Sequence, residues 1–206
     1  MNARPGALRM ALLGAECTGK TTLASRLHRT LSEQGWCVHR VDEVLRDWCV
    51  RNGRTPGANE QEPIALEQTA RGLASGCHDI LVSDTTALMT AIYSELHFGD
   101  PSLTRNAVEA LRSFDLILLL APDIPWVADG LQRDGPQQRS RFHARLCEVL
   151  EDHQLPHDLV QGQGTERMAR ALEQVESALR NRLAPVVAHR EPNAPVGSQA
   201  VRPPGG

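Results

Sequence analysis

Short aliphatic runs alternate with longer segments of helical period along most of this chain. The aliphatic runs lack polar alternation, which is typical of strands buried on both faces of a parallel sheet. We expect five such strands, at Leu8–Leu13, Cys37–Val41, Ile80–Ser83, Leu116–Leu120 and His157–Gln161.

Between and after these runs, seven segments carry apolar residues at the spacing of an amphipathic helix. They are Gly19–Gln34, Asp42–Asn52, Gln61–Gly76, Ala87–Phe98, Ser102–Ser113, Gln137–His153 and Thr165–Arg182. Alternating strands and helices predict a three-layer α/β fold. Because crossovers between parallel strands are almost always right-handed, helices should cover both faces of the sheet.

The periodic pattern ends near residue 183, so we expect one domain over residues 7–183. From Ala184 onward the chain is rich in Pro, Gly and polar residues and shows no period. Residues 184–206 are therefore expected to form a disordered tail, with a docking peptide as the alternative interpretation. A domain of this size can bury its own core without a metal or a disulfide.

Charge and cysteine content narrow the class of protein. The formal net charge of -3 argues against a protein whose main task is to bind nucleic acid. The five cysteines are odd in number and include no CxxC pair, which favours free thiols in a reducing cytosol. No stretch approaches the roughly 20 apolar residues of a membrane span. We expect a cytoplasmic protein whose partner is a small molecule, and the sequence leaves the oligomeric state open.

A phosphate-loop motif, G-x-x-x-x-G-K-[ST], follows the first expected strand and matches at every fixed position. Its residues are Gly14, Ala15, Glu16, Cys17, Thr18, Gly19, Lys20 and Thr21, with Thr22 next in the expected helix. Glycine lets backbone N–H groups wrap phosphate oxygens, and the start of the helix adds positive potential. A strand before the motif and a helix after it are the context that the motif requires.

Two side chains of this motif and one acid further along indicate a nucleoside triphosphate with Mg²⁺. Lys20 can reach the β- and γ-phosphates as a point charge, and the Thr21 hydroxyl can ligate the metal. Asp84 ends the run Ile80–Ser83. In P-loop folds, an acid at the end of a second strand faces the Mg²⁺ shell. Asp84 could instead cap the helix that follows it.

Another acid, Glu43, follows the expected strand Cys37–Val41. Asp42 and Glu43 together look like the Asp-Glu ending of ATPase motors, but polar residues interrupt the strand before them. An acid at this place also suits the binding and deprotonation of an acceptor hydroxyl. Because the carboxyl ends of parallel strands meet at one edge of the sheet, Glu43 and Asp84 should converge on the phosphate loop.

Taken together, four segments resemble the ATPase/kinase domain of the NadR type, whose known members phosphorylate nicotinamide riboside. The segments are the loop Gly14–Thr22, the stretch Asp42–Asp47, the region Val82–Gly99 and the region Pro122–Arg133. The resemblance implies a P-loop kinase fold with a parallel five-stranded sheet of order 2-3-1-4-5, and ATP and Mg²⁺ as cofactors. We expect the single-domain form, without the adenylyltransferase domain that bifunctional members carry.

The resemblance also assigns roles around the phosphate loop. Lys20 and Thr21 would hold the phosphates and the metal. Glu43 and Arg46 would face the acceptor, and Asp84 would face the metal or the acceptor.

Further along the chain, the resemblance assigns a lid and a base-binding loop. Arg133, with Arg139 or Arg141, would lie in a mobile lid over the transferred phosphate. Gly162 would lie in the loop near the adenine base, and Arg167 would open the next helix.

Aromatic side chains near the site have two interpretations. Trp126 follows a proline after the fourth strand, where it could form a wall of the acceptor pocket or pack against the protein. Tyr93 and Glu95 follow Asp84 on one helix, where they could contact the acceptor or serve the helix alone.

The leading hypothesis is a small-molecule kinase that transfers the γ-phosphoryl group of ATP to a hydroxyl of a nucleoside-like acceptor such as nicotinamide riboside. Glu43 would accept or orient the hydroxyl proton, while Lys20, Mg²⁺ and Arg133 would stabilise the transferred group. One alternative is an ATP-binding regulatory or switch ATPase without a small-molecule acceptor. Another is a motor-type ATPase. The chain carries no Asn/Thr-Lys-x-Asp element for guanine, which favours adenine.

Overall fold

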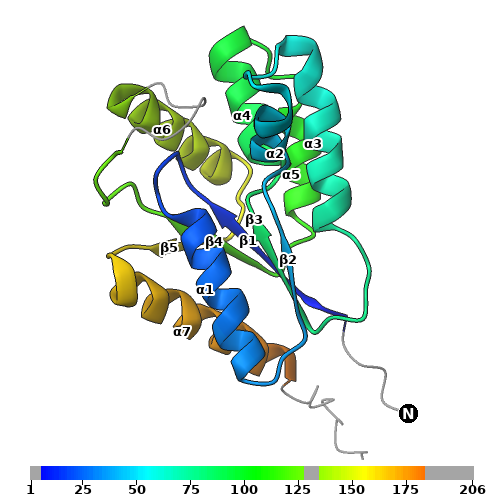
Figure 1. Ribbon diagram of the computed structural model, residues 1–206, viewed down its shortest axis with the longest axis vertical. Coiled ribbons are helices and arrows are strands. Elements are labelled where there is room, and N and C mark those ends of the chain that lie inside the picture. Colours follow the sequence, from blue (N-terminus) through cyan, green and yellow to red (C-terminus); the bar gives the residue numbers. More distant parts are fainter. Residues whose placement is uncertain (1–5, 128–134, 184–206) are drawn as a thin grey trace, which may run out of the picture.

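The computed structural model describes residues 6–127 and 135–183 (Figure 1). Two predictions lie outside the described residues: the lid arginine Arg133 and the tail over residues 184–206. No helix within the described residues is long and apolar enough to cross a bilayer.

Five parallel strands form one sheet in the order β2-β3-β1-β4-β5, which confirms the fold expected from the resemblance. The strands are β1 (Leu8–Leu13), β2 (Val38–Val41), β3 (Ile80–Asp84), β4 (Leu116–Leu120) and β5 (Asp158–Val160). Strand β1 lies at the centre, between β3 and β4. The loop that follows β1 therefore has a strand end on each side.

Helices cover both faces of the sheet (Figure 1). They are α1 (Lys20–Glu33), α2 (Val44–Asn52), α3 (Ala58–Gly72), α4 (Ala87–Phe98), α5 (Thr104–Leu111), α6 (Pro136–Asp152) and α7 (Gly164–Leu183). Helices α1 and α7 bury their apolar residues in one hydrophobic cluster, and α4, α5 and α6 bury theirs in another. The predicted three-layer arrangement is confirmed.

The central strand supplies side chains to both clusters in alternation. Met10 and Leu12 pack toward α1 and α7, whereas Ala11 and Leu13 pack toward α4, α5 and α6. Because successive side chains of a strand point to opposite faces, a strand covered on both faces needs apolar residues on both of them, and in β1 only the half-buried Arg9 departs from this. This explains the absence of polar alternation in the sequence.

Six of the seven helices begin one to three residues from the predicted start, and α2 and α3 show the physical reasons. Helix α2 begins at Val44 instead of Asp42, because Glu43 has an extended backbone and the Val44 N–H donates to the Gln68 side chain at 2.8 Å. Helix α3 begins three residues before the predicted Gln61, at Ala58. Its start is held by the Glu60 carboxylate, which accepts from the Gly57 N–H at 2.8 Å.

Candidate functional site

The phosphate loop runs from the end of β1 to the start of α1. Gly14 has a φ of 151°, and a Cβ atom there would lie 2.8 Å from Thr18 Oγ1 and 2.9 Å from the Leu120 carbonyl oxygen. A larger residue cannot fit there without displacing the loop or β4. Gly19 has a φ of 81° and precedes the first residue of α1. Both glycines of the motif therefore meet a steric or conformational requirement of the loop.

The carbonyl groups at the start of this loop accept hydrogen bonds from side chains of the same loop. Lys20 Nζ donates to the Gly14 carbonyl at 2.7 Å and to the Ala15 carbonyl at 3.0 Å. Thr18 Oγ1 donates to the same Ala15 carbonyl at 2.8 Å. Burial lowers the pKa of the Lys20 amine below its ordinary value, and the charges of Glu43 and Asp84 act in the opposite direction.

The loop borders a cavity of about 530 Å³. Its walls come from the phosphate loop with the start of α1, the segment from the end of β2 into α2, helix α4 and the segment after β4. The lining residues are Glu16, Cys17, Thr18, Gly19, Lys20, Thr21, Thr22, Glu43, Arg46, Met89, Tyr93, Ile124, Pro125 and Val127. The cavity thus lies at the carboxyl edge of the sheet, where α/β folds bind ligands.

Glu43 and Asp84 lie at this edge, at the ends of two neighbouring strands. Glu43 follows β2 and lines the cavity, and burial raises the pKa of its carboxyl group. Asp84 is the last residue of β3, is 1% exposed, and pairs in register with Leu12 of β1. Both carboxylates influence Lys20 electrostatically, so the structure brings together the acids that the sequence placed at two strand ends.

Oxygen atoms suited to Mg²⁺ occur at two points of this edge. Thr21 lines the cavity, and its hydroxyl oxygen accepts from Arg46 at 3.1 Å. The Oδ1 atom of Asp84 is buried and has no hydrogen-bond partner in the described part of the chain. Mg²⁺ prefers oxygen ligands and keeps waters and phosphate oxygens in its shell. The described residues contain no cluster of three acidic, His or Cys ligands, and a phosphate-bound Mg²⁺ does not require one.

Arg46 contacts both the phosphate loop and the acid that follows β2. Its guanidinium group lies 3.5 Å from the Glu43 carboxylate while it donates to Thr21. It therefore contacts one residue expected to hold the metal and one expected to face the acceptor. About half of the Arg46 side chain is exposed.

Helix α4 supplies two wall residues. Met89 and Tyr93 are four positions apart, so they lie on the same side of the helix. The Tyr93 hydroxyl donates to Glu16 of the phosphate loop at 3.0 Å. The Tyr93 ring packs against that of Phe142, with 4.7 Å between the ring centroids. Tyr93 was a candidate from the sequence, whereas Met89 was not predicted. The available signal was the start of α4 three residues after Asp84, because a helix that begins so close to a strand end has its first turns at the carboxyl edge.

The segment after β4 lines the cavity through Ile124, Pro125 and Val127. Trp126 is half-buried, and it is absent from the cavity lining. This arrangement favours the packing interpretation of Trp126 over its role as a pocket wall.

Four further predicted residues lie outside the cavity lining. Gly162 lies between β5 and α7, and Arg167 lies in the first turns of α7 with a side chain that is 5% exposed. Neither of them lines the cavity. Arg139 of α6 is 6% exposed, whereas Arg141 is exposed to solvent. Of the two arginines that the resemblance offered as companions of Arg133, one is therefore buried and the other is on the surface.

The sheet order and the phosphate loop together define a P-loop kinase fold. One solved structure with this fold is that of NadR protein in complex with NAD and AMP-PNP, which has a TM-score of 0.65 and 19% identity and covers 84% of this chain and 49% of that chain. Another is thymidylate kinase from Ehrlichia chaffeensis, with a TM-score of 0.58, 16% identity and coverage of 84% of this chain and 99% of that chain. At these identities, the likeness shows the fold.

Residues 9–167 match the model of an AAA domain family, and the chain belongs to this family. The trifunctional NAD biosynthesis/regulator protein NadR of Escherichia coli is 27% identical over 156 residues, which are 71% of this chain and 36% of that protein. Its counterpart from Salmonella typhimurium is 27% identical over 154 residues, with the same coverage. The predicted resemblance to NadR-type domains is confirmed, and the chain spans about a third of the length of these relatives.

Proposed function

We propose that this protein is an ATP- and Mg²⁺-dependent small-molecule kinase. The observation that carries the proposal is one cavity that is bordered by the phosphate loop and by Glu43 at the neighbouring strand end. A loop that binds a triphosphate beside a carboxylate that can accept a proton provides the two halves of a phosphoryl-transfer site.

At the phosphate loop, we assign the triphosphate to the backbone N–H groups and to Lys20. On binding, Lys20 Nζ would exchange its two carbonyl partners for phosphate oxygens, which offer stronger charge-assisted hydrogen bonds. Thr21 and Asp84 would hold Mg²⁺, which neutralises charge on the phosphates when it is bound. The adenine base is assigned to the loop that contains Gly162, at the same edge of the sheet.

On the acceptor side, we assign the proton-accepting role to Glu43. Its raised pKa brings the carboxylate closer to the basicity that general-base catalysis at neutral pH requires. Arg46, which lies 3.5 Å from Glu43, would orient the acceptor or the transferred phosphate. The relatives are named for NAD biosynthesis, which makes nicotinamide riboside or a similar nucleoside the first acceptor to test.

The test is ATP consumption by the purified protein with a panel of nucleosides that includes nicotinamide riboside. We expect one acceptor to raise turnover well above the basal rate. Glu43→Gln should lower that rate by about 10²–10⁴-fold and leave ATP binding in place, because a positioned base contributes about this much. Asp42→Asn is the matched control, since Asp42 is the preceding acid but is exposed and paired with Arg40 at 2.7 Å.

If no nucleoside raises turnover and Glu43→Gln changes nothing, the kinase proposal is wrong. Tight ATP binding with slow hydrolysis under those conditions would instead support a regulatory or switch ATPase.

A further inference from the structure

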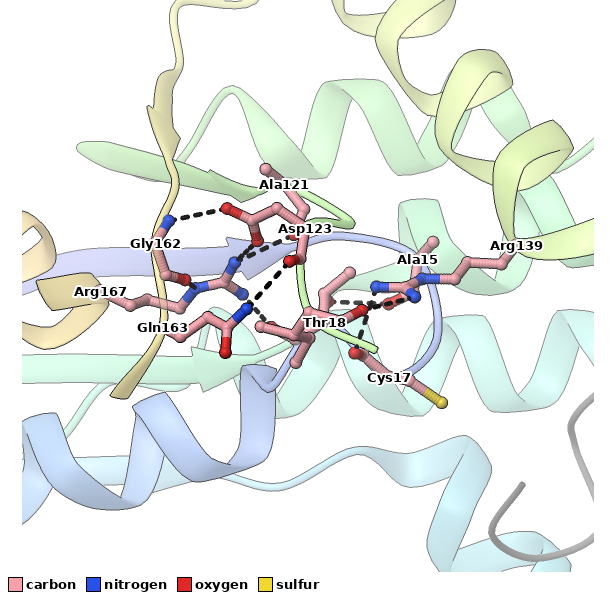
Figure 2. Close-up of polar contacts among 10 residues, drawn as sticks. Ala15, Cys17, Thr18, Ala121, Asp123, Arg139, Gly162, Gln163 and Arg167 are labelled. Atoms are coloured by element: carbon pink, nitrogen blue, oxygen red, sulfur yellow. Dashed lines mark hydrogen bonds and ion pairs between the residues drawn. The ribbon is translucent and has the colours of Figure 1, made fainter. Parts of the chain in front are cut away.

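Two buried arginines donate hydrogen bonds to backbone carbonyl groups of the phosphate loop. Arg167 of α7 and Arg139 of α6 are 5% and 6% exposed. Figure 2 shows the loop residues Cys17 and Thr18 lying between the two guanidinium groups. A buried arginine requires partners for its charge and its donors, so the groups that it contacts indicate its role.

The Arg167 guanidinium donates to acceptors from three separate segments. Its Nε donates to the Gly162 carbonyl at 2.7 Å, and its Nη2 donates to the Ala121 carbonyl at 3.1 Å and to the Asp123 carboxylate. Its Nη1 donates to the carbonyl of Thr18 in the phosphate loop. These bonds use both edges of the guanidinium and leave it engaged by the protein rather than directed into the cavity.

Asp123 completes the link to the loop between β5 and α7. One of its carboxylate oxygens accepts from Arg167, and the other accepts from the Gly162 N–H at 2.7 Å. The Gln163 side chain donates to the Asp123 carbonyl at 3.3 Å. The segment after β4, the Gly162 loop and the phosphate loop therefore share one hydrogen-bond network, which is centred on the buried guanidinium of Arg167 (Figure 2).

Holding a carbonyl of the phosphate loop also fixes an N–H group. In a trans peptide the C=O group and the following N–H point in opposite directions within one rigid plane, and the described chain has no cis peptide. The bond from Arg167 to the Thr18 carbonyl directs the Gly19 N–H away from Arg167. In the same way, the bond of 3.4 Å from Arg139 to the Cys17 carbonyl directs the Thr18 N–H away from Arg139.

We infer that Arg167 is a positioning residue that pre-orients the N–H groups of the phosphate loop, with Arg139 as a second support, and that it does not recognise the base. The inference rests on the proposed function, because it concerns the same phosphate site. A pre-oriented set of donors binds an anion without the cost of ordering the loop. Arg167 should therefore affect any ligand that carries the polyphosphate, whether or not a base is attached.

The test compares the binding of Mg·ATP with the binding of Mg·tripolyphosphate, which has no base, by calorimetry on the full chain. Arg167→Gln should weaken both ligands by a similar factor, about tenfold or more, because one charge-assisted hydrogen bond to the loop is lost. The matched control is Arg170→Gln. Arg170 lies almost one turn later on α7, is about half exposed and pairs with Glu166 at 2.9 Å. This control should leave both affinities unchanged.

Loss of ATP affinity alone would overturn the inference, because it would make Arg167 a base-contacting residue. Unchanged affinities with a lowered melting temperature would also overturn it, because they would indicate a purely structural role. If Arg167→Gln does not fold, the variants Asp123→Asn and Arg139→Gln replace it. They should also weaken the binding of Mg·ATP and of Mg·tripolyphosphate by a similar factor. A wild-type protein that binds neither ligand would contradict the proposed function itself.

Discussion

Thr85, directly after β3, has a φ of 89°, a backbone conformation that a β-branched residue rarely adopts. The residue is 3% exposed, and its hydroxyl oxygen is buried with no hydrogen-bond partner in the described part of the chain. Its carbonyl accepts from Ser83 Oγ at 2.6 Å, which holds the turn in place. Strain of this kind, roughly 1–3 kcal/mol, is concentrated at functional sites, and Thr85 adjoins Asp84.

We predict that Thr85→Gly raises the melting temperature by a few degrees, because glycine removes the strain and the unpaired hydroxyl at an entropic cost of about 0.5–1 kcal/mol. Differential scanning calorimetry measures the change. Thr86→Gly is the control with the opposite sign, since Thr86 has a φ of -142° and its hydroxyl caps α4 by accepting from the Leu88 N–H. A lower melting temperature for Thr85→Gly would show that the turn is not strained.

At the residue scale, the sequence revealed groups that belong to a local motif and missed those that act over long separations. Gly14 and Lys20 could be identified because both belong to one short loop, whose geometry fixes the spacing between them along the sequence. The roles of Arg139 and Arg167 could not be identified in this way. Arg167 donates to a backbone carbonyl 149 positions away, and every residue type carries such a carbonyl.

Among the elements, α3 shows how a helix start depends on one side chain. The Glu60 carboxylate accepts from the Gly57 N–H at 2.8 Å and from Arg54 through both of its oxygens, at 2.7 and 2.8 Å. These hydrogen bonds, that from Arg54 first, lower the pKa of Glu60 from 4.5 to about 2. A carboxyl pKa that is lower in the folded state stabilises the fold above the ordinary pKa, and this stabilisation is lost as the pH falls toward the folded value.

Glu60→Gln should therefore lower the melting temperature at neutral pH, and its difference from the wild type should shrink as the pH falls from 4.5 toward about 2. Thermal unfolding followed by circular dichroism over this range measures the difference. The control is Glu67→Gln, which removes another acid of α3 that pairs with Arg71 at 2.5 Å. A difference that stays constant with pH would exclude the ionised carboxylate as its cause.

Element by element, the strands were easier to predict than the helix starts. Strands β1 and β4 have the predicted bounds, because the need for apolar residues on both faces leaves an aliphatic run in which Arg9 of β1 is the one polar residue. The start of α3 was placed at Gln61 because its apolar period begins there, but the cap formed by Glu60 extends the helix toward Gly57. The period marks the buried face of a helix, whereas the cap sets its end.

For the molecule as a whole, hydrophobic periodicity indicated the layers and the parallel sheet, but the strand order came from the family resemblance. Periodicity shows which residues are buried and does not show which strands are neighbours. The order places β1 between β3 and β4, so the phosphate loop lies beside Asp84 on one side and Leu120 on the other. Because of this arrangement, the phosphate loop forms one wall of the binding cavity.

The central claim is that the loop from Gly14 to Thr21 holds a magnesium-bound nucleoside triphosphate. The most direct measurement is titration calorimetry of the full chain with Mg·ATP, with Lys20→Ala as the variant and Arg170→Gln as the control. We predict saturable binding to the wild type and to the control, and a loss of about tenfold or more in Lys20→Ala, because a charge-assisted contact to the phosphates is removed. Absence of binding to the wild type, or an unchanged affinity in Lys20→Ala, would contradict the claim.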